Sequence, residues 1–120
     1  MTIGALQRLV DEAAVPASLQ RTGLPRAVPD VVARTAHRVT GDALAAVLDA
    51  TTATVAIEYM PGALVVQVDD DGQPVRDGLD GAADIAAGIG GGLTAAPAPG
   101  GFRVRAWLPT EGQPPPRRQR

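Results

Sequence analysis

Three stretches of the chain carry apolar residues at helical spacing. In residues 3–14 apolar side chains recur every three or four positions with charged ones opposite, which predicts an amphipathic helix ending before Pro16. A longer helix is predicted from Pro29 and Asp30 to about residue 50, because proline and an acid both favour a first turn. The alanine-rich residues 79–89 predict a third helix, which is capped by Gly90, Gly91 and Gly92.

Other stretches alternate apolar and polar positions, which is the period of a half-buried strand. Residues 51–60 and 63–68 flank Pro61 and Gly62 and predict a hairpin. Residues 93–96 and 102–108 flank a turn at residues 97–101 and predict a closing hairpin. Alternation at Val15, Ala17 and Leu19 predicts one earlier strand.

The predicted order of elements is α-β-α-β-β-α-β-β. Helices on one face of a mixed sheet pack this order economically, so we expect an α/β (α+β) fold that forms a two-layer sandwich. A single domain is expected over residues 1–109, since 120 residues suffice for one core. Residues 110–120 are rich in proline, glycine, glutamine and arginine, which predicts a disordered tail.

Composition excludes several classes of function. The chain has no cysteine and one histidine, His37, so a disulfide framework and a multi-histidine metal centre are excluded within one chain. A net charge of −2 argues against a nucleic-acid surface. No apolar run is long enough to span a membrane and no secretory signal is visible, so we expect a cytoplasmic protein. We interpret His37 as a surface or interface residue of the long helix.

The order of elements and three stretches together resemble the ATP-binding catalytic domain of sensor histidine kinases, within the superfamily of gyrase-, Hsp90-, histidine-kinase- and MutL-type ATPases. The strongest of these stretches is the closing hairpin, residues 92–109 (GLTAAPAPGGFRVRAWLP). The most similar type is the actinobacterial kinase paired with LuxR-like response regulators. The resemblance covers residues 15–109 and implies a Bergerat-like ATP-binding fold.

The second stretch is the acidic strand end Asp69-Asp70-Asp71-Gly72. The family has an Asp-x-Gly-x-Gly loop here, whose first Asp accepts a hydrogen bond from the adenine amino group. Asp70 and Gly72 match its first two positions, whereas Pro74, which fixes φ and lacks an N–H, replaces the second glycine. The resemblance implies adenine contact at Asp70, although three acids in a row also fit a solvated strand end with turn-forming residues.

The third stretch, Asp42-Ala43-Leu44, lies in the long predicted helix. It resembles the family's Glu-Ala-Leu-x-Asn pattern, in which the Glu activates water or neighbouring polar groups and the Asn binds Mg²⁺. Asp42 takes the Glu position and is the catalytic candidate, although it is also typical of a surface helix acid. Ala46 takes the Asn position and offers no lone pair. The resemblance therefore implies ATP or ADP as the ligand and argues against Mg²⁺.

Residues 76–81 resemble a reduced form of the family's Gly-His-Gly-Leu-x-Gly motif, whose backbone N–H groups hold the triphosphate. Asp77 replaces the histidine and adds negative charge near the phosphates. Only residues 73–77 stand where the family has a lid, so the lid is expected to be short. The nucleotide-contacting residues implied by the resemblance are Asp70, Gly72, Arg76, Gly78, Leu79 and Gly81.

We predict a degenerate histidine-kinase-like ATPase domain with weak or no adenine-nucleotide binding. It would have no autonomous phosphoryl transfer, because the parts that position and neutralise phosphates are the altered ones. Any phosphorylation is expected only in trans, with a sensor kinase or a response regulator as partner. Two alternatives stay open: a homodimeric interaction or regulatory protein, and a small-molecule-binding or catalytic pocket in a biosynthetic pathway. The sequence leaves open whether the chain is a natural short protein or an excised domain.

Overall fold

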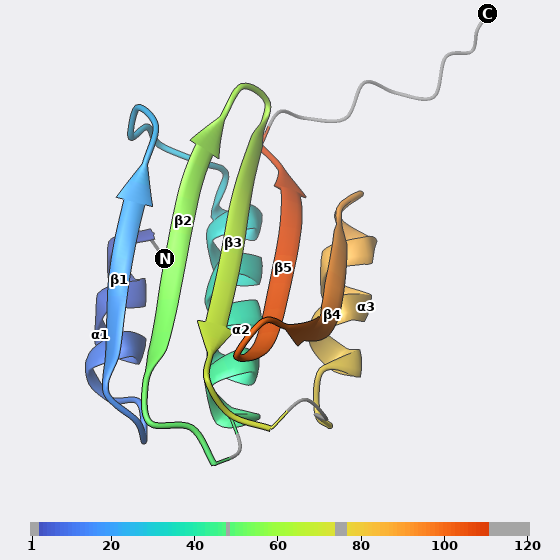
Figure 1. The fold of residues 1–120 in the computed structure, drawn as a ribbon. Helices are drawn as coiled ribbons and strands as arrows, with labels where there is room; N and C mark the ends of the chain where they lie inside the picture. The colour runs from blue at the N-terminus through green and yellow to red at the C-terminus, as the bar shows by residue number, and fades with distance from the viewer. Residues whose placement is uncertain (1–2, 48, 74–76, 111–120) are drawn as a thin grey trace, which may run out of the picture.

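The chain forms one mixed sheet with its helices on one side. The computed structural model describes residues 3–47, 49–73 and 77–110. The elements in chain order are η1 (Ile3–Ala5), α1 (Leu6–Asp11), β1 (Ala17–Thr22), α2 (Asp30–Ala45), β2 (Ala53–Met60), β3 (Ala63–Asp70), α3 (Asp80–Gly88), β4 (Gly92–Ala98) and β5 (Gly101–Pro109). The strand order is β1-β2-β3-β5-β4, with β1 parallel to β2 and the other neighbours antiparallel. The α-helices lie on one face (Figure 1), so the expected two-layer α/β sandwich is confirmed.

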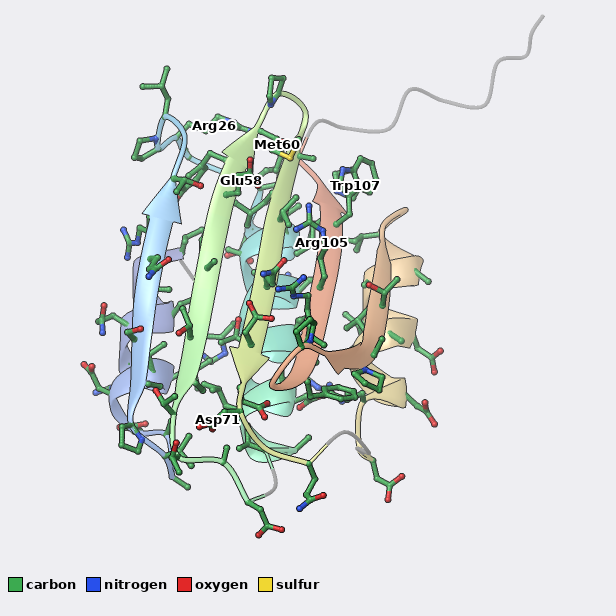
Figure 2. All side chains as sticks on the ribbon, in the orientation of Figure 1. Arg26, Glu58, Met60, Asp71, Arg105 and Trp107 are labelled. Carbon is green, nitrogen blue, oxygen red and sulfur yellow. The ribbon has the colours of Figure 1, made fainter. Side chains whose placement is uncertain are left out.

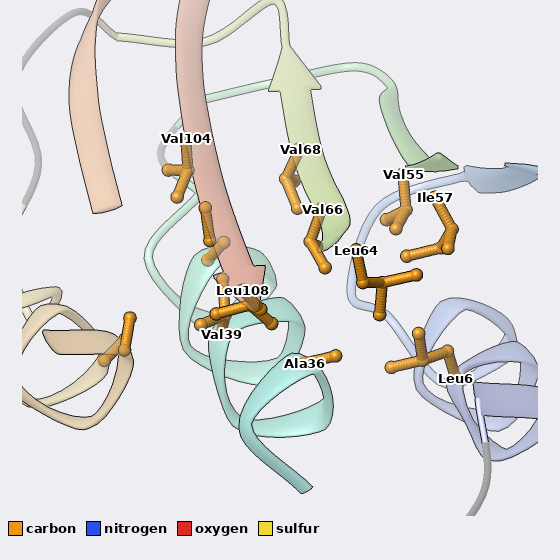
Figure 3. Packing of buried hydrophobic residues seen from close by; sticks show 14 of the residues in the cluster. Leu6, Ala36, Val39, Val55, Ile57, Leu64, Val66, Val68, Val104 and Leu108 are labelled. Atoms are coloured by element: carbon orange, nitrogen blue, oxygen red, sulfur yellow. The ribbon is translucent and has the colours of Figure 1, made fainter. Parts of the chain in front are cut away.

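The core fills the space between the helices and the sheet. Alternate residues of β2, β3 and β5 point toward α2, which lies behind the middle of the sheet (Figures 1 and 3). Leu6 of α1 and Val39 of α2 are fully buried against them. The apolar faces that the sequence pattern predicted for the helices and strands therefore face one another across the two layers. Buried members of this cluster include Val55, Ile57, Leu64, Val66, Val68, Val104 and Leu108.

The long helix ends earlier than its apolar pattern predicted. α2 stops at Ala45 instead of near residue 50, and the N–H of Ala46 closes it on the carbonyl of Asp42 at 3.0 Å. Asp49, four residues beyond the end of α2, adopts a positive φ of 55°, a conformation that aspartate tolerates. Apolar residues continue past Ala45, so the spacing of apolar positions gave no signal that the helix ends there.

Several strand and helix ends also differ from the prediction. The first helix begins as the turn η1 and ends at Asp11, so the predicted end near residue 14 was wrong. β1 starts after Pro16 and runs on to Thr22. β3 extends two residues beyond Val68, because Asp69 and Asp70 pair with neighbours on both sides in the ladder. The acidic run therefore belongs to the strand rather than following it.

The glycine-rich cap after α3 is confirmed at two of its three positions. Gly90 has φ 89°, its N–H donates to the Ala87 carbonyl at 3.0 Å, and the Gly91 N–H donates to Ala86 at 2.9 Å. This pattern is a Schellman motif. Gly92 was wrongly assigned to the cap, since it is the first residue of β4.

At the opposite end of the sheet from Asp70, the chain is tied together by Arg26. Its Nη2 donates to the Met60 carbonyl at 2.6 Å and to Thr110 Oγ1 at 3.0 Å. Thr110, which the composition assigned to the tail, is buried and donates its N–H to the Gly62 carbonyl at 3.0 Å. The rest of the predicted tail, residues 111–120, lies outside the described residues.

Candidate functional site

Most of the residues implied in nucleotide binding lie at one end of the molecule. The end of β3, the last turn of α2 and the first turn of α3 meet at the lower end of the sheet in Figure 1. Segments 70–72 and 78–81, which only residues 73–77 separate in the chain, lie at this same end. Arg76, the cation implied at this site, lies outside the described residues.

Asp70, the residue for which the resemblance implies adenine contact, lies at the end of β3. It is the last residue of β3, and the alternation that buries Val66 and Val68 places it on the helix-facing side of the sheet. Its Oδ1 accepts the Gly72 N–H at 2.8 Å, an Asx-type turn that orients the carboxylate. A Cβ on Gly101 of β5 would overlap the Asp70 carbonyl oxygen, so the two strands approach closely here. The position of Asp70 is therefore fixed by both its own turn and β5.

The two acids beside Asp70 have structural partners instead. Asp69 Oδ1 accepts from Arg103 Nε at 2.7 Å, in an ion pair on the face opposite the helices. Asp71 accepts the N–H groups of Thr51 and Thr52 at 2.7 and 3.1 Å and a bond from the Thr51 hydroxyl. The Thr51 hydroxyl, followed by these N–H groups, lowers the pKa of the Asp71 carboxyl below its usual value. The turn-forming interpretation thus describes Asp70, whose carboxylate accepts the Gly72 N–H, whereas Asp69 and Asp71 bind residues of other strands and loops.

The start of α3 preserves the backbone geometry of a glycine-rich turn. Gly78 has φ 87°, a left-handed conformation that favours glycine, and Leu79 follows as a buried residue preceding the first helical turn. Asp80 is exposed in that first turn. No side-chain hydrogen bond from the described residues caps the N-terminus of α3 at Leu79.

Arg38 is the residue of this region that sequence reasoning missed. Its Nη2 lies 2.8 Å from the point that a Cβ on Gly81 would occupy, so the guanidinium from α2 rests on the first turn of α3. Its Nε donates to Asp42 Oδ2 at 2.8 Å, and the side chain is 49% exposed. The only sequence signal was the spacing of Arg38 and Asp42, four residues apart on one helix. The approach to Gly81 comes from tertiary packing.

Asp42, the catalytic candidate, and Ala46, at the implied metal position, both lie in the last turns and the C-cap of α2. Asp42 is bound to Arg38 and is 27% exposed. Ala46 is the residue that terminates α2 and packs at the edge of the core. Among residues 3–47, 49–73 and 77–110, no group of three metal-ligating side chains comes together.

His37 is not one of the residues implied in nucleotide binding, and two pockets of the structure include none of them. His37 is half-buried on α2. One pocket, of about 320 Å³, lies between α1 and α2 and is lined by Leu9, Gly41 and Leu44. Another, of about 570 Å³, lies beside Arg26 and Tyr59 at the other end of the sheet. Neither pocket is lined by Asp70, Gly72 or the start of α3. Within the part of the chain that is described, no helix is long and apolar enough to cross a membrane.

Comparison with known proteins gives matches by structure. No family model and no curated protein matches the sequence. A blue-light activated histidine kinase from Erythrobacter litoralis superposes with a TM-score of 0.66 at 21% identity, over 92% of this chain and 42% of that one. The catalytic domain of the histidine kinase ThkA gives 0.66 at 14% identity, over 92% and 90%. Acinetobacter baumannii AdeS, another histidine kinase, gives 0.65 at 14%, over 92% and 61%.

The fold is that of a histidine kinase catalytic domain. The expected Bergerat-like fold is therefore confirmed, because nearly the whole ThkA catalytic domain superposes on this chain. The chain spans less than half the length of the Erythrobacter kinase, so the histidine-kinase-like fold here corresponds to one part of such a protein.

Proposed function

We propose that this chain is a degenerate histidine-kinase-like ATPase domain that binds an adenine nucleotide weakly, without Mg²⁺, and does not itself transfer phosphoryl groups. The observation that carries the proposal is the combination of two residues at the phosphate end, Ala46 at the C-cap of α2 and Arg38 within α2. Ala46 puts a methyl group where the family has its Mg²⁺ ligand, and Arg38 places a guanidinium on the first turn of α3.

The adenine end supports binding. Asp70 is half-buried on the helix-facing side of the sheet, and its Oδ1 is already oriented by the Gly72 N–H at 2.8 Å. A carboxylate fixed in this way can accept a hydrogen bond from an adenine amino group without reorganising, which favours binding. The glycine at position 72 allows close approach of a ring.

The phosphate end argues against catalysis. Phosphoryl transfer depends on positioning and on neutralising charge, for which the family uses a metal ion bridging the phosphates. Asp80 is in the first turn of α3 and Asp77 precedes it, so two negative charges belong to the segment that the resemblance implies for phosphate binding. Arg38 offsets one charge but is held by Asp42. Weak retention of the phosphates without turnover follows.

A domain that binds but does not transfer would act by association in a two-component system. The fold supports a sensor kinase or a response regulator as the partner, in the cytoplasm, where such domains work. To distinguish the two partner classes, a purified sensor kinase or a purified response regulator is added to this chain. Complex formation is then measured with and without ADP.

The test is a calorimetric titration of the chain with ATP, ADP and a non-hydrolysable ATP analogue, with and without Mg²⁺. We expect saturable binding with a Kd of about 1 mM, equivalent to about −4 kcal/mol, that Mg²⁺ does not strengthen. Asp70→Asn keeps an oxygen for the Gly72 N–H but alters the acceptor, so affinity should fall about tenfold. Asp84→Asn, an exposed acid on α3, is the matched control and should change nothing.

Two results would overturn the proposal. Absence of binding at millimolar nucleotide would leave a scaffold without its ligand. Mg²⁺-dependent tightening, or transfer of radiolabelled phosphate from ATP to the protein, would show that the domain is an active one.

A further inference from the structure

The face of the sheet opposite the helices carries no described element over it (Figures 1 and 2). We call this surface the open face. It presents the outward-pointing residues of β2, β3 and β5, in neighbouring register positions. The members used below are Glu58, Val65, Gln67, Asp69, Arg103, Arg105 and Trp107.

The centre of the open face is apolar. Val65 is 2% exposed although no helix covers it, and it pairs across the ladder with Trp107. Trp107, the only tryptophan, is 47% exposed and is the largest exposed apolar side chain of β5. An exposed aromatic beside a buried aliphatic is typical of a binding anchor, because tryptophan is enriched at the centres of protein interfaces.

The charges around this centre are not all neutralised within the chain. Asp69 and Arg103 form an ion pair at 2.7 Å. Arg105 donates to the neutral Gln67 at 2.9 Å, and among the described residues no acid lies within ion-pair distance of it. Glu58, exposed on β2, likewise has no basic partner in the described segments. One positive and one negative side chain thus flank the apolar centre.

The register fixes where these two charges lie. Glu58, Val65 and Trp107 follow one another across β2, β3 and β5 in a single row. Arg105 lies two residues before Trp107 on β5, so its Cα is about 12 Å from that of Glu58 at ordinary strand spacings. The midpoint between them falls on β3, between Val65 and Gln67. Consider a twofold axis that runs parallel to the sheet and passes through this point. It places Glu58 of each copy over Arg105 of the other copy.

The same axis also matches the apolar centres. With ordinary strand spacings it passes between Val65 and Trp107, so Trp107 of each copy lies over Val65 of the other and the two indoles adjoin. The arrangement is isologous, since each contact occurs twice. One axis therefore satisfies both the charges and the aromatic residue.

We propose that the open face is a homodimer interface in which a second copy packs face to face, with Glu58 of each copy against Arg105 of the other and both Trp107 side chains at the centre. The interface uses none of the residues implied in nucleotide binding. It therefore goes beyond the proposed function, and it can succeed or fail independently of that function.

The test is sedimentation equilibrium of the full chain over a range of concentrations, with tryptophan fluorescence as a second readout. Wild type should show a concentration-dependent mass that reaches the dimer, and a Trp107 emission that shifts to the blue as the dimer forms. Glu58→Arg and Arg105→Glu, each alone, place like charges together and should raise the dimer Kd about tenfold or more. The double variant E58R/R105E restores opposite charges and should return the wild-type Kd.

Asp84→Arg makes the same change in net charge as Glu58→Arg, but on α3, away from the open face, and should leave the dimer unchanged. Rescue by the double variant also separates an interface effect from misfolding of a single variant. A monomer at every concentration would overturn the proposal. A dimer that neither reversal weakens, or that Asp84→Arg weakens equally, would place the interface elsewhere and overturn it as well.

Discussion

Nη2 of Arg38 in α2 lies 2.8 Å from the point that a Cβ atom on Gly81 in α3 would occupy. The glycine therefore lets a guanidinium rest directly on the backbone of a neighbouring helix. A flexible side-chain tip can move away, whereas a backbone cannot. This distinction separates two glycines of the same region, Gly81 and Gly101, and leads to the first prediction.

Gly81→Ala and Gly101→Ala should differ sharply in stability. At Gly81 the new methyl displaces only the Arg38 tip and gains helix propensity, so the free energy of unfolding should change by less than about 1 kcal/mol. At Gly101 a Cβ would meet the Asp70 carbonyl and come within 2.7 Å of the Asp71 Cα, which should cost about 2–3 kcal/mol. Urea unfolding of both variants measures this. Equal losses would contradict the close approach of β5 to β3.

Arg38→Gln should weaken binding of phosphorylated nucleotides selectively. Removing the guanidinium that rests on α3 takes away positive charge where phosphates would lie, so affinity for ATP and ADP should fall about threefold to tenfold. Adenosine, which lacks phosphates, should bind as before. Arg34→Gln on the same helix removes an exposed cation from an ion pair with Asp30 and is the matched control. If Arg38→Gln lowered the affinity for adenosine as much as that for ATP and ADP, Arg38 would act on the fold alone.

Asp71 should make stability depend on pH. Its folded pKa lies below the ordinary 3.8, so its stabilising effect is fully present above that value and is lost as pH falls through the lowered pKa. Asp71→Ala should therefore lower the Tm near neutral pH, and the difference from wild type should shrink below pH 3.8. Melting curves from neutral to strongly acid pH measure it, with Asp84→Ala as control. A difference that stays constant with pH would contradict this role.

Arg26→Ala should loosen the upper end of the sheet. The substitution removes hydrogen bonds to the Met60 carbonyl at 2.6 Å and the Thr110 hydroxyl at 3.0 Å, and a cation–π contact with Tyr59 at 5.8 Å. Because the guanidinium is largely exposed, we expect a loss of about 1 kcal/mol in urea unfolding. Arg34→Ala breaks only an exposed pair within α2 and should cost less than about 0.5 kcal/mol. Equal losses in both variants would remove the special role of Arg26.

The layers of the fold followed from local pattern, but the ends of elements did not. The turn at Pro61 and Gly62 lies where the sequence predicted it, because glycine there adopts φ 72°. The end of α2 was missed, because apolar residues continue past Ala45 and give no periodic signal of where the helix stops. β3 ran on through Asp70 because pairing on both sides outweighs the low strand preference of aspartate.

The candidate site was predictable only where contacts are local. Asp70 and Gly72 are two residues apart and could be paired from the sequence. Asp71 and Thr51 are twenty residues apart, and Arg38 and Gly81 meet across two helices. No spacing rule relates such residues, because their proximity depends on how α2, α3 and β2 pack. The sequence singled out Asp70 only through the resemblance, and it did not predict that Asp69 pairs with Arg103 or that Asp71 binds Thr51.

The single parallel ladder of the sheet has a kinetic consequence. β2 and β3 are joined by a short turn, so their hairpin closes with little loss of chain entropy. α2 separates β1 from β2 in the chain, and α3 and β4 separate β3 from β5, so both pairings join segments that are far apart in the sequence. Non-local pairings of this kind slow folding, so we expect the β2–β3 hairpin to form first and β1 and β5 to pair with it later.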